Sequence, residues 1–390
     1  MDYSKFLNPE VCVIPPSGIR KFFDIANTME GVISLGVGEP DFVTPWKIRR
    51  AGITSLEDGR TRYTANRGLA GLRNEIAVYL KRKYNLGYDP ASEILITIGG
   101  SEAIDATIRA LVCPGEEVLI PQPSYVCYEP MTRLAGGVPV IIETKAENEF
   151  KLTPEELLAA ITDKTKLLIL PYPCNPTGAV MEREDLEKIA KILKEKEIFV
   201  LSDEIYSELT YACNHCSIGS IEGMKEQSVV VNGFSKAFSM TGWRLGYACG
   251  PAPVMEQINK IHQYAIMCAP TTAQHAAIEA LRNCDEEVAQ MKEEYDMRRR
   301  LMVSGFNRLG LSCHEPKGAF YTFPSIKKTG MTSNEFCERL LLSEKVALVP
   351  GTAFGDCGEG FVRASYCYSI EHIARALARI ERFLQKEGLL

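Results

Sequence analysis

Short runs of apolar residues alternate along the chain with longer segments in which apolar residues recur at the period of a helix. The runs are rich in Val, Ile and Leu, which is typical of buried strands. They lie at 93–98, 117–121, 138–143, 166–170, 198–203 and 228–232. Because strands that alternate with helices form largely parallel sheets, the pattern predicts an α/β domain.

Three of the intervening segments carry clear helix signals. The segment after the first predicted strand opens with Gly-Gly-Ser and places Ile104, Ile108 and Leu111 on one face. Another begins at Thr153, where Thr-Pro-Glu-Glu combines a capping box with proline at the first helical position. Residues 182–196 form a charged amphipathic segment. We expect these helices to flank the sheet.

The pattern changes at about Asp285, where a long charged helical segment begins. Short strand-like segments follow at 318–325 and 346–351, and a last helix is predicted from Ile370. This order predicts a second, smaller α+β domain. The expected division is a large cofactor-binding domain at 46–284 and a small domain made of 1–45 and 285–390.

Several polar side chains come directly after predicted strands or at their ends. They are Ser101, Asn175, Asp203 and Lys236. Ligands of open α/β sheets bind outside the carboxyl ends of the strands. The sequence therefore predicts that these four residues meet in one crevice.

Lys236 lies in the stretch GFSKAFSMTGWRLGY at 233–247. A lone lysine in a loop is usually a solvated charge. Here Ser235 offers a hydroxyl, and Arg244 offers a planar donor fork that suits a phosphate. The P-loop spacing is absent, so a phosphorylated cofactor that reacts with an amine is the better hypothesis. Pyridoxal 5'-phosphate fits this description.

Asp203 is placed to test that hypothesis, because a carboxylate beside a pyridine nitrogen favours its protonated form. Tyr206, three residues on, projects from the same side if the chain turns helical there, and it offers a hydroxyl to the ring's phenolate oxygen. Asn175, in PYPCNPTG, is a second donor. The alternatives are a helix cap for Asp203 and an ordinary turn at Asn175.

Composition narrows the remaining possibilities. A chain of 390 residues with 46% hydrophobic content can bury a large core and divide into two domains. A net charge of −6 without a basic run argues against a nucleic-acid partner. No apolar stretch approaches the roughly 20 residues that span a bilayer, so no membrane role is expected.

The 13 cysteines follow no disulfide framework, and the first residues lack a signal peptide, which together predict a reduced, cytoplasmic protein. Cys213 and Cys216 have the spacing of a redox or metal motif around His215. No second ligand pair completes such a site, so a plain surface loop after Tyr211 is the better interpretation.

Six motifs together resemble one enzyme family over nearly the whole chain. They are LGVGEPDFVTP at 35–45, YTANRGLAGLR at 63–73, PYPCNPTG at 171–178, SDEIYSEL at 202–209, SKAFSMTGWRLGY at 235–247 and VRASY at 362–366. In these motifs the chain resembles the class I/II aminotransferases, which are pyridoxal-phosphate enzymes of fold type I. It looks closest to the bacterial branch named as aromatic amino acid or N-acetyl-diaminopimelate aminotransferases.

The resemblance implies a set of cofactor contacts. Lys236 would bind pyridoxal 5'-phosphate covalently, Asp203 would pair with the ring nitrogen, and Tyr206 and Asn175 would hold the phenolate oxygen. Tyr125 would stack on the ring. The phosphate would lie at a helix N-terminus, where it would meet the backbone N–H groups of Gly100, Ser101 and Glu102. Ser235 and Arg244 would complete the phosphate site.

Substrate and subunit contacts are also implied by the resemblance. Arg363 would clamp the substrate α-carboxylate, and Gly38 would contact the same group through its backbone. Tyr63 would reach the cofactor phosphate of a second subunit, so the protein would be a homodimer with shared active sites. Without the resemblance, Tyr63 would be assigned as a core aromatic residue.

The expected activity is transfer of an amino group between an L-amino acid and a 2-oxo acid with ping-pong kinetics. Lys236 would act as nucleophile and then as general base. Some family members that prefer dicarboxylic substrates have a lysine where Ser101 stands, which weighs against an aspartate-specialised enzyme. The alternatives are a carbon–sulfur lyase on the same fold and, more remotely, a non-enzymatic regulator that binds the cofactor.

Overall fold

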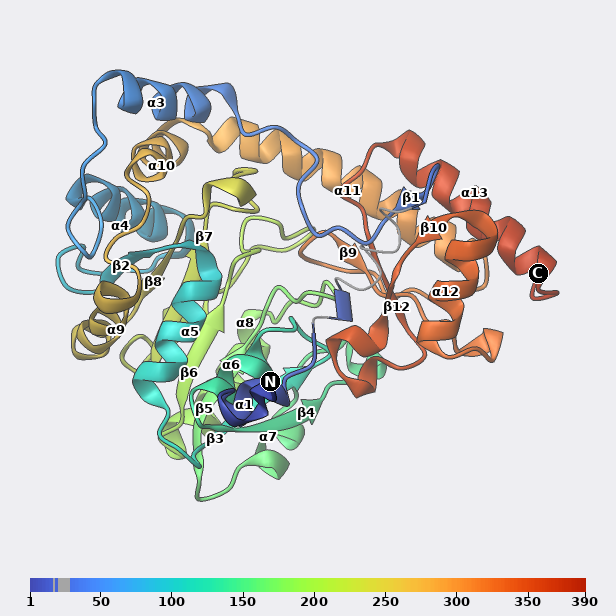
Figure 1. Ribbon diagram of the computed structural model, residues 1–390, viewed down its shortest axis with the longest axis horizontal. Helices are drawn as coiled ribbons and strands as arrows, with labels where there is room; N and C mark the ends of the chain where they lie inside the picture. Colours follow the sequence, from blue (N-terminus) through green and yellow to red (C-terminus); the bar gives the residue numbers. More distant parts are fainter. Residues whose placement is uncertain (17, 20–28) are drawn as a thin grey trace.

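A seven-stranded sheet forms the centre of the larger part of the computed structural model, which describes residues 1–16, 18–19 and 29–390 (Figure 1). The strands are β2 (Ile94–Thr97), β3 (Glu117–Gln122), β4 (Val138–Glu143), β5 (Thr165–Leu170), β6 (Phe199–Asp203), β7 (Ser228–Gly233) and β8 (Gly246–Cys249). Their order is β2-β8-β7-β6-β5-β3-β4. All pairs are parallel except those of β8, which runs antiparallel to β2 and β7.

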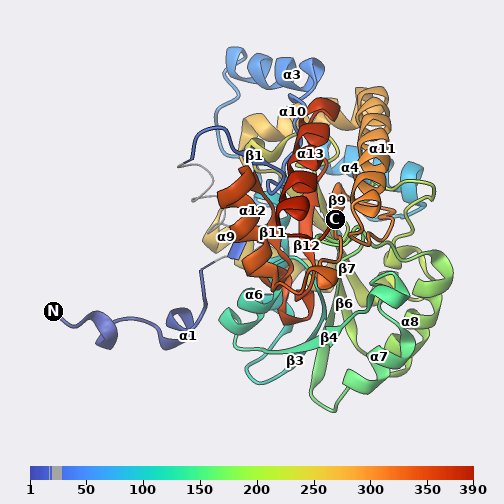
Figure 2. The same cartoon turned by 90° about the vertical axis from the view of Figure 1, so that its right-hand side faces the viewer.

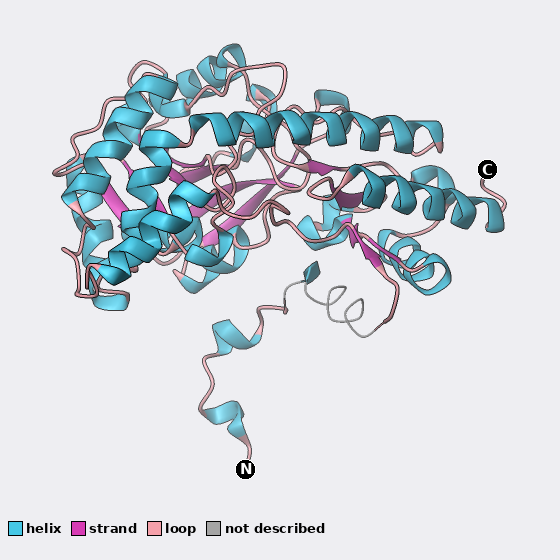
Figure 3. Cartoon of the chain, turned by 90° about the horizontal axis from the view of Figure 1, so that it is seen from above, coloured by secondary structure: helices cyan, strands magenta, loops and turns pink. Residues whose placement is uncertain are grey.

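The sheet is apolar on both faces because neighbouring residues of each strand face opposite layers. Along β5, Leu167 and Ile169 pack in one hydrophobic cluster, whereas Leu168 and Leu170 pack in another. The first cluster includes side chains of α5 (Gly99–Leu111) and α9 (Ala252–Ala265). The second includes side chains of α7 (Pro154–Ala160) and α8 (Arg183–Glu195). Helices therefore cover both faces, as Figure 3 shows.

Other helices complete the larger part. They are α3 (Trp46–Glu57), α4 (Ala70–Tyr84), α6 (Tyr128–Leu134) and α10 (Thr271–Asn283). The predicted capping box at α7 is present, with the Thr153 hydroxyl accepting from the Glu156 N–H and the Glu156 carboxylate accepting from the Thr153 N–H. No helix among the described residues has the length and apolar character to cross a membrane.

The C-terminal part begins with α11 (Asp285–Arg308), which extends from α10 to the side of α13 (Ile370–Lys386) (Figure 1). β9 (Tyr321–Thr322), β11 (Val349–Pro350) and β12 (Val362–Ser365) form an antiparallel sheet in the order β11-β12-β9. α12 (Ser333–Glu344) precedes β10 (Val346–Ala347), which pairs in parallel with β1 (Ile33–Ser34).

That pairing joins an N-terminal segment to the C-terminal part. The first residues of the chain, including α1 (Pro9–Cys12), extend away from the rest of the chain (Figure 2).

The seven-stranded, mostly parallel sheet with helices on both faces confirms the predicted α/β fold. The division at 46–284 remains a prediction, and α11 runs directly from its C-terminal boundary.

Two local features of the structure were not predicted. The condition that the chain turns helical after Asp203 is not met, because that segment forms turns. β8 was not predicted, because Gly246–Cys249 is short and its first two residues belong to the stretch that resembles a ligand loop.

Candidate active site

A cavity of about 440 Å³ opens at the carboxyl ends of the parallel strands. β6 ends at Asp203, and the turn after β7 carries Lys236 into the same space. Eleven of the predicted site residues line this cavity: Gly38, Gly100, Ser101, Tyr125, Asn175, Asp203, Tyr206, Ser235, Lys236, Arg244 and Arg363. The predicted convergence of the strand ends is therefore observed.

The Lys236 side chain is partly buried in the cavity wall. Its Nζ donates a hydrogen bond to the Gly38 carbonyl at 2.7 Å and lies 5.6 Å from the centre of the Phe320 ring. Burial lowers the pKa of Lys236 to about 8. A lysine amine with this pKa is partly neutral near pH 7, which is what a nucleophile or general base requires.

The Asp203 carboxylate is buried and fixed at both oxygens. Oδ1 accepts a hydrogen bond from the Ile205 N–H at 3.2 Å, and Oδ2 accepts one from the Tyr128 hydroxyl at 2.8 Å. Burial raises the pKa of Asp203, whereas these two hydrogen bonds act to lower it. The carboxylate is thus available as a partner for a protonated ring nitrogen.

Tyr206 shares a hydrogen bond with Tyr321 across the cavity. The two hydroxyl oxygens are 2.9 Å apart, and the side chain of Tyr206 is buried. Although the chain is not helical after Asp203, the turns still direct Tyr206 into the cavity.

The N-terminus of α5 forms the anion-binding corner of the cavity. Ser235 and Arg244 lie beside Gly100 and Ser101 on the cavity wall. Gly99 has a φ of +75°, which favours glycine, and a Cβ there would lie 2.9 Å from an Arg244 guanidinium nitrogen. Free N–H groups, a helix dipole and an arginine fork together suit a phosphate.

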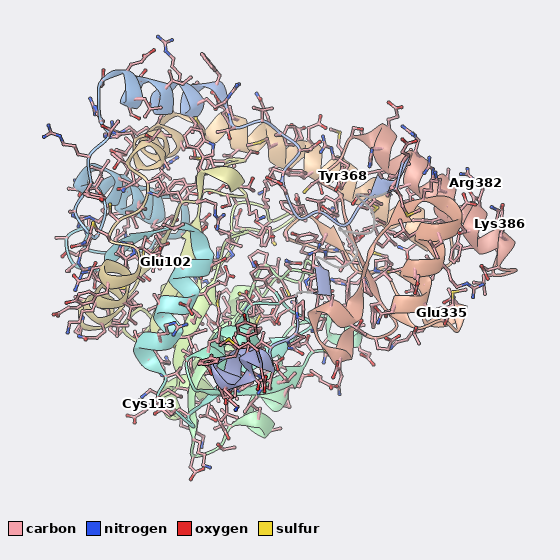
Figure 4. The ribbon with its side chains drawn as sticks, in the orientation of Figure 1. Glu102, Cys113, Glu335, Tyr368, Arg382 and Lys386 are labelled. Carbon is pink, nitrogen blue, oxygen red and sulfur yellow. The ribbon has the colours of Figure 1, made fainter. Side chains whose placement is uncertain are left out.

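Glu102 was predicted to belong to this corner, but its side chain does not line the cavity. It lies on α5 (Figure 4), and its carboxylate bonds the Ile98 N–H and the buried imidazole of His262 on α9. Only its backbone N–H remains available for the predicted contact.

Arg363 carries a buried charge near the opposite wall. Its side chain is 2% exposed and lies between the rings of Tyr321 and Phe354, with its Cζ 4.4 Å and 4.7 Å from their centres. The guanidinium donates to the Asn175 side-chain oxygen at 2.8 Å and to the Gly36 carbonyl. Burial lowers the pKa of Arg363.

No ion pair joins Arg363 to a carboxylate in the described part of the chain, and its Nε is buried without a partner there. A buried arginine without an acidic partner suits a carboxylate ligand. Together with the amine, the phosphate corner and the ring-nitrogen partner, this arrangement fits pyridoxal 5'-phosphate and an amino-acid substrate.

Tyr63 lies outside the cavity, with 81% of its surface exposed. The alternative assignment as a core aromatic residue is therefore wrong. Its predicted contact with a second subunit stays a prediction.

Sequence reasoning missed two tyrosines of the cavity wall, Tyr128 and Tyr321. Tyr128 follows Tyr125 by three residues, and the two rings meet edge to face at 5.9 Å. That spacing was a usable signal. Tyr321 gave none, because it is 115 residues from Tyr206 in the chain.

Cys213 and Cys216 lie in a loop, and both thiols are free. Within the described residues, no cluster of three potential metal ligands is present. One side chain of the loop points inward: the His215 side chain is 4% exposed, and its Nε2 lies 2.8 Å from a carboxylate oxygen of the buried Glu204. His215 therefore belongs to the core beneath the loop.

Comparisons with known proteins agree with this geometry. The family model for aminotransferase class I and II matches residues 30–380. The chain is 55% identical to a putative aminotransferase, YugH, of Bacillus subtilis over 98% of this chain and 99% of that protein. It is 47% identical to an aspartate aminotransferase of Pyrococcus abyssi over 97% of this chain and 98% of that protein. An aromatic aminotransferase structure from Pyrococcus horikoshii matches with a TM-score of 0.91 and 44% identity over 95% of this chain and 100% of that chain.

Proposed function

This chain belongs to the class I and II aminotransferases and is a pyridoxal-phosphate-dependent transaminase, and from that premise we propose a role for each cavity residue. Transaminases of this family move an amino group between an L-amino acid and a 2-oxo acid in two half-reactions. When bound, the cofactor supplies an electron sink for the substrate's Cα. The protein supplies binding, orientation and proton transfer.

The cavity residues fit the cofactor as follows. Lys236 would bind it covalently, and Asp203 would pair with the ring nitrogen. Tyr206 and Asn175 would donate to the phenolate oxygen, and Tyr125 would stack on the ring. The phosphate is bound by two side chains and the backbone N–H groups of the α5 terminus: Ser235, Arg244, Gly100, Ser101 and Glu102. The convergence of Lys236, Asp203, Arg244 and Arg363 on one cavity is the observation that carries this assignment.

The substrate is oriented by its α-carboxylate. Arg363 binds that group through its fork, and Asn175 and the backbone at Gly38 lie against the same position. The Lys236 amine would serve as the base that takes the proton from the substrate's Cα. Its hydrogen bond to the Gly38 carbonyl, at 2.7 Å, supports this role, because the Gly38 backbone is the proposed contact for the substrate carboxylate.

The side chain of the substrate is proposed to be uncharged. The four charged residues among the described cavity lining are Asp203, Lys236, Arg244 and Arg363, and each already has a role. The side chains of Ile19 and Val126 give the wall apolar surface, and Ser101 adds an uncharged hydroxyl. The names of the relatives differ on this point, because they include both aspartate and aromatic aminotransferases.

A second copy of the chain is proposed to complete each site through Tyr63. Support comes from large apolar side chains that are exposed on α3 and at the end of α9. They are Trp46 at 56%, Ile53 at 46%, Leu56 at 55% and Tyr264 at 88%. Such exposure suits an interface between identical subunits.

A screen of amino donors against 2-oxoglutarate and pyruvate tests this function. We expect aromatic or aliphatic donors to turn over only in the presence of a 2-oxo acid. Lys236→Ala is the matched control, and it should bind the cofactor through the phosphate corner yet lose nearly all turnover. Release of pyruvate and ammonia without an acceptor would instead identify the carbon–sulfur lyase. A strong preference for aspartate would contradict the proposed substrate class.

A further inference from the structure

Tyr128 contacts Asp203, the carboxylate proposed to face the cofactor's ring nitrogen. It opens α6, and its side chain is 2% exposed. Its hydroxyl donates to Asp203 Oδ2 at 2.8 Å, and Asp203 Oδ1 accepts from the Ile205 N–H at 3.2 Å. Within the described part of the chain, Tyr128 is therefore the side chain that donates a hydrogen bond to this buried carboxylate.

The phenol is suited to remain a donor. Burial raises the pKa of Tyr128 well above its ordinary value, and the adjacent Asp203 charge acts in the same direction. The hydroxyl thus keeps its proton and stabilises the ionised form of the carboxylate. The Tyr128 ring is fixed in turn by edge-to-face contact with Tyr125, at a ring-centre distance of 5.9 Å.

We propose that Tyr128 is a positioning residue that holds Asp203 ionised and oriented toward the cofactor's ring nitrogen. The inference rests on the proposed role of Asp203. A purely structural role would require only that the ring fill its place between α6 and the sheet. The positioning role requires the hydroxyl oxygen of Tyr128, whereas the structural role requires only the ring.

Tyr128→Phe removes that oxygen and keeps the ring. The experiment measures the dissociation constants of pyridoxal 5'-phosphate and of its 1-deaza analogue, in which carbon replaces the ring nitrogen, for the cofactor-free protein. Their ratio reports the contribution of the ring nitrogen alone. Because both constants come from the same preparation, a partial loss of folded protein cancels from the ratio.

We expect the wild-type preference for the natural cofactor to fall about 10-fold in Tyr128→Phe, which is the size of a hydrogen bond to a charged group. Tyr211→Phe is the matched control. It deletes an equally buried hydroxyl, which donates to the neutral Ala319 carbonyl at 2.7 Å away from the cavity lining, and it should leave the ratio unchanged.

Asp203→Asn tests the proposed role of Asp203 by itself, since it should abolish the preference for the natural cofactor over the 1-deaza analogue. If Asp203→Asn reduces the ratio but Tyr128→Phe weakens both ligands equally, Tyr128 is structural and the inference is overturned while the proposed function stands. If Asp203→Asn leaves the ratio intact, the role of Asp203 fails and the inference fails with it.

Discussion

At the scale of single residues, the buried Lys236 amine links the chemistry of the site to the stability of the fold. Its pKa of about 8 lies below the ordinary value of 10.5, because burial penalises the charged form. Below pH 8 both the folded and unfolded states carry the proton, so the folded state bears the full cost of the buried charge. Between pH 8 and 10.5 the folded state loses its proton first, and the cost declines.

We therefore predict that cofactor-free Lys236→Met is more stable than the cofactor-free wild type at pH 7, by about 3 kcal/mol. The difference should shrink as the pH rises from 8 toward 10.5. Urea unfolding at several pH values measures it, and Lys260→Met, at an exposed lysine of α9, is the control. A stability difference that does not change with pH would contradict the buried, partly neutral amine.

Arg363 is predicted to affect all substrates equally. Arg363→Ala should lower kcat/KM for every amino acid by about 30-fold to several-thousand-fold, because losing one partner of a buried charge pair costs roughly 2 to 5 kcal/mol. Arg363→Lys keeps the charge but loses the fork, so it should recover only part of the activity. Circular dichroism checks that the rings of Tyr321 and Phe354 still pack. An effect confined to one class of side chain would make Arg363 a specificity residue.

The sequence predicted site residues well where they lie near strand ends, and poorly where tertiary packing decides. Asp203 and Lys236 follow apolar runs, so their convergence follows from the rule for parallel sheets. Gly38 and Arg363 come from opposite ends of the chain, and only family resemblance indicated them. Tyr321 gave no local signal, since its contact with Gly38 exists only after both segments fold.

At the scale of elements, the loop at 36–45 is fitted closely to the site. The Gly36 carbonyl accepts from Arg363, and the Gly38 carbonyl accepts from Lys236. A Cβ at Gly38 would overlap the Tyr321 hydroxyl oxygen and lie 3.1 Å from Cζ of that ring. The loop therefore needs glycine at position 38 because of a side chain on β9.

We predict that Gly38→Ala strongly reduces turnover by pushing the loop or Tyr321 out of place. Tyr321→Phe removes the overlapping oxygen, so the double variant should recover part of the loss. A double-mutant cycle of kcat/KM for the two positions measures this coupling. Gly59→Ala on an open turn, where a Cβ meets nothing within 4 Å but φ is +67°, is a control for backbone strain. Strictly additive effects of Gly38→Ala and Tyr321→Phe would contradict the steric explanation.

Predicted elements were most accurate where pattern and capping agreed. The box at Thr153 fixed the start of α7, and the six apolar runs all became strands of one sheet. A helix after Asp203 was considered as a condition, and a helix cap was the alternative role of Asp203. In the structure, Asp203 Oδ1 does accept from the Ile205 N–H, but it closes a turn instead.

At the scale of the whole molecule, shared active sites can be tested by mixing subunits. Tyr63→Phe alone should weaken cofactor binding modestly, since one of several phosphate hydrogen bonds is lost at roughly 1 to 3 kcal/mol. Lys236→Ala alone should be inactive. If Tyr63 acts on the partner, a heterodimer of the two variants has one site with both groups intact, supplied by different chains.

The measurement is cofactor retention at the single active site of purified heterodimers. Wild-type retention is expected. Heterodimers that keep the weak binding of Tyr63→Phe would refute the shared site, as would a fully active monomer in solution.

The location of the site residues along the chain also sets the order in which the site can be completed during synthesis. Except for Tyr63, the residues proposed to hold the cofactor lie within 100–244, whereas the hydrogen bond from Arg363 to Gly36 spans 327 residues. β1 likewise cannot pair with β10 until Val346–Ala347 has left the ribosome. Since nascent chains fold from the N-terminus onward, we expect a growing polypeptide to acquire its affinity for the vitamin-derived cofactor before its affinity for amino acids, which also requires Arg363 near the end of the chain.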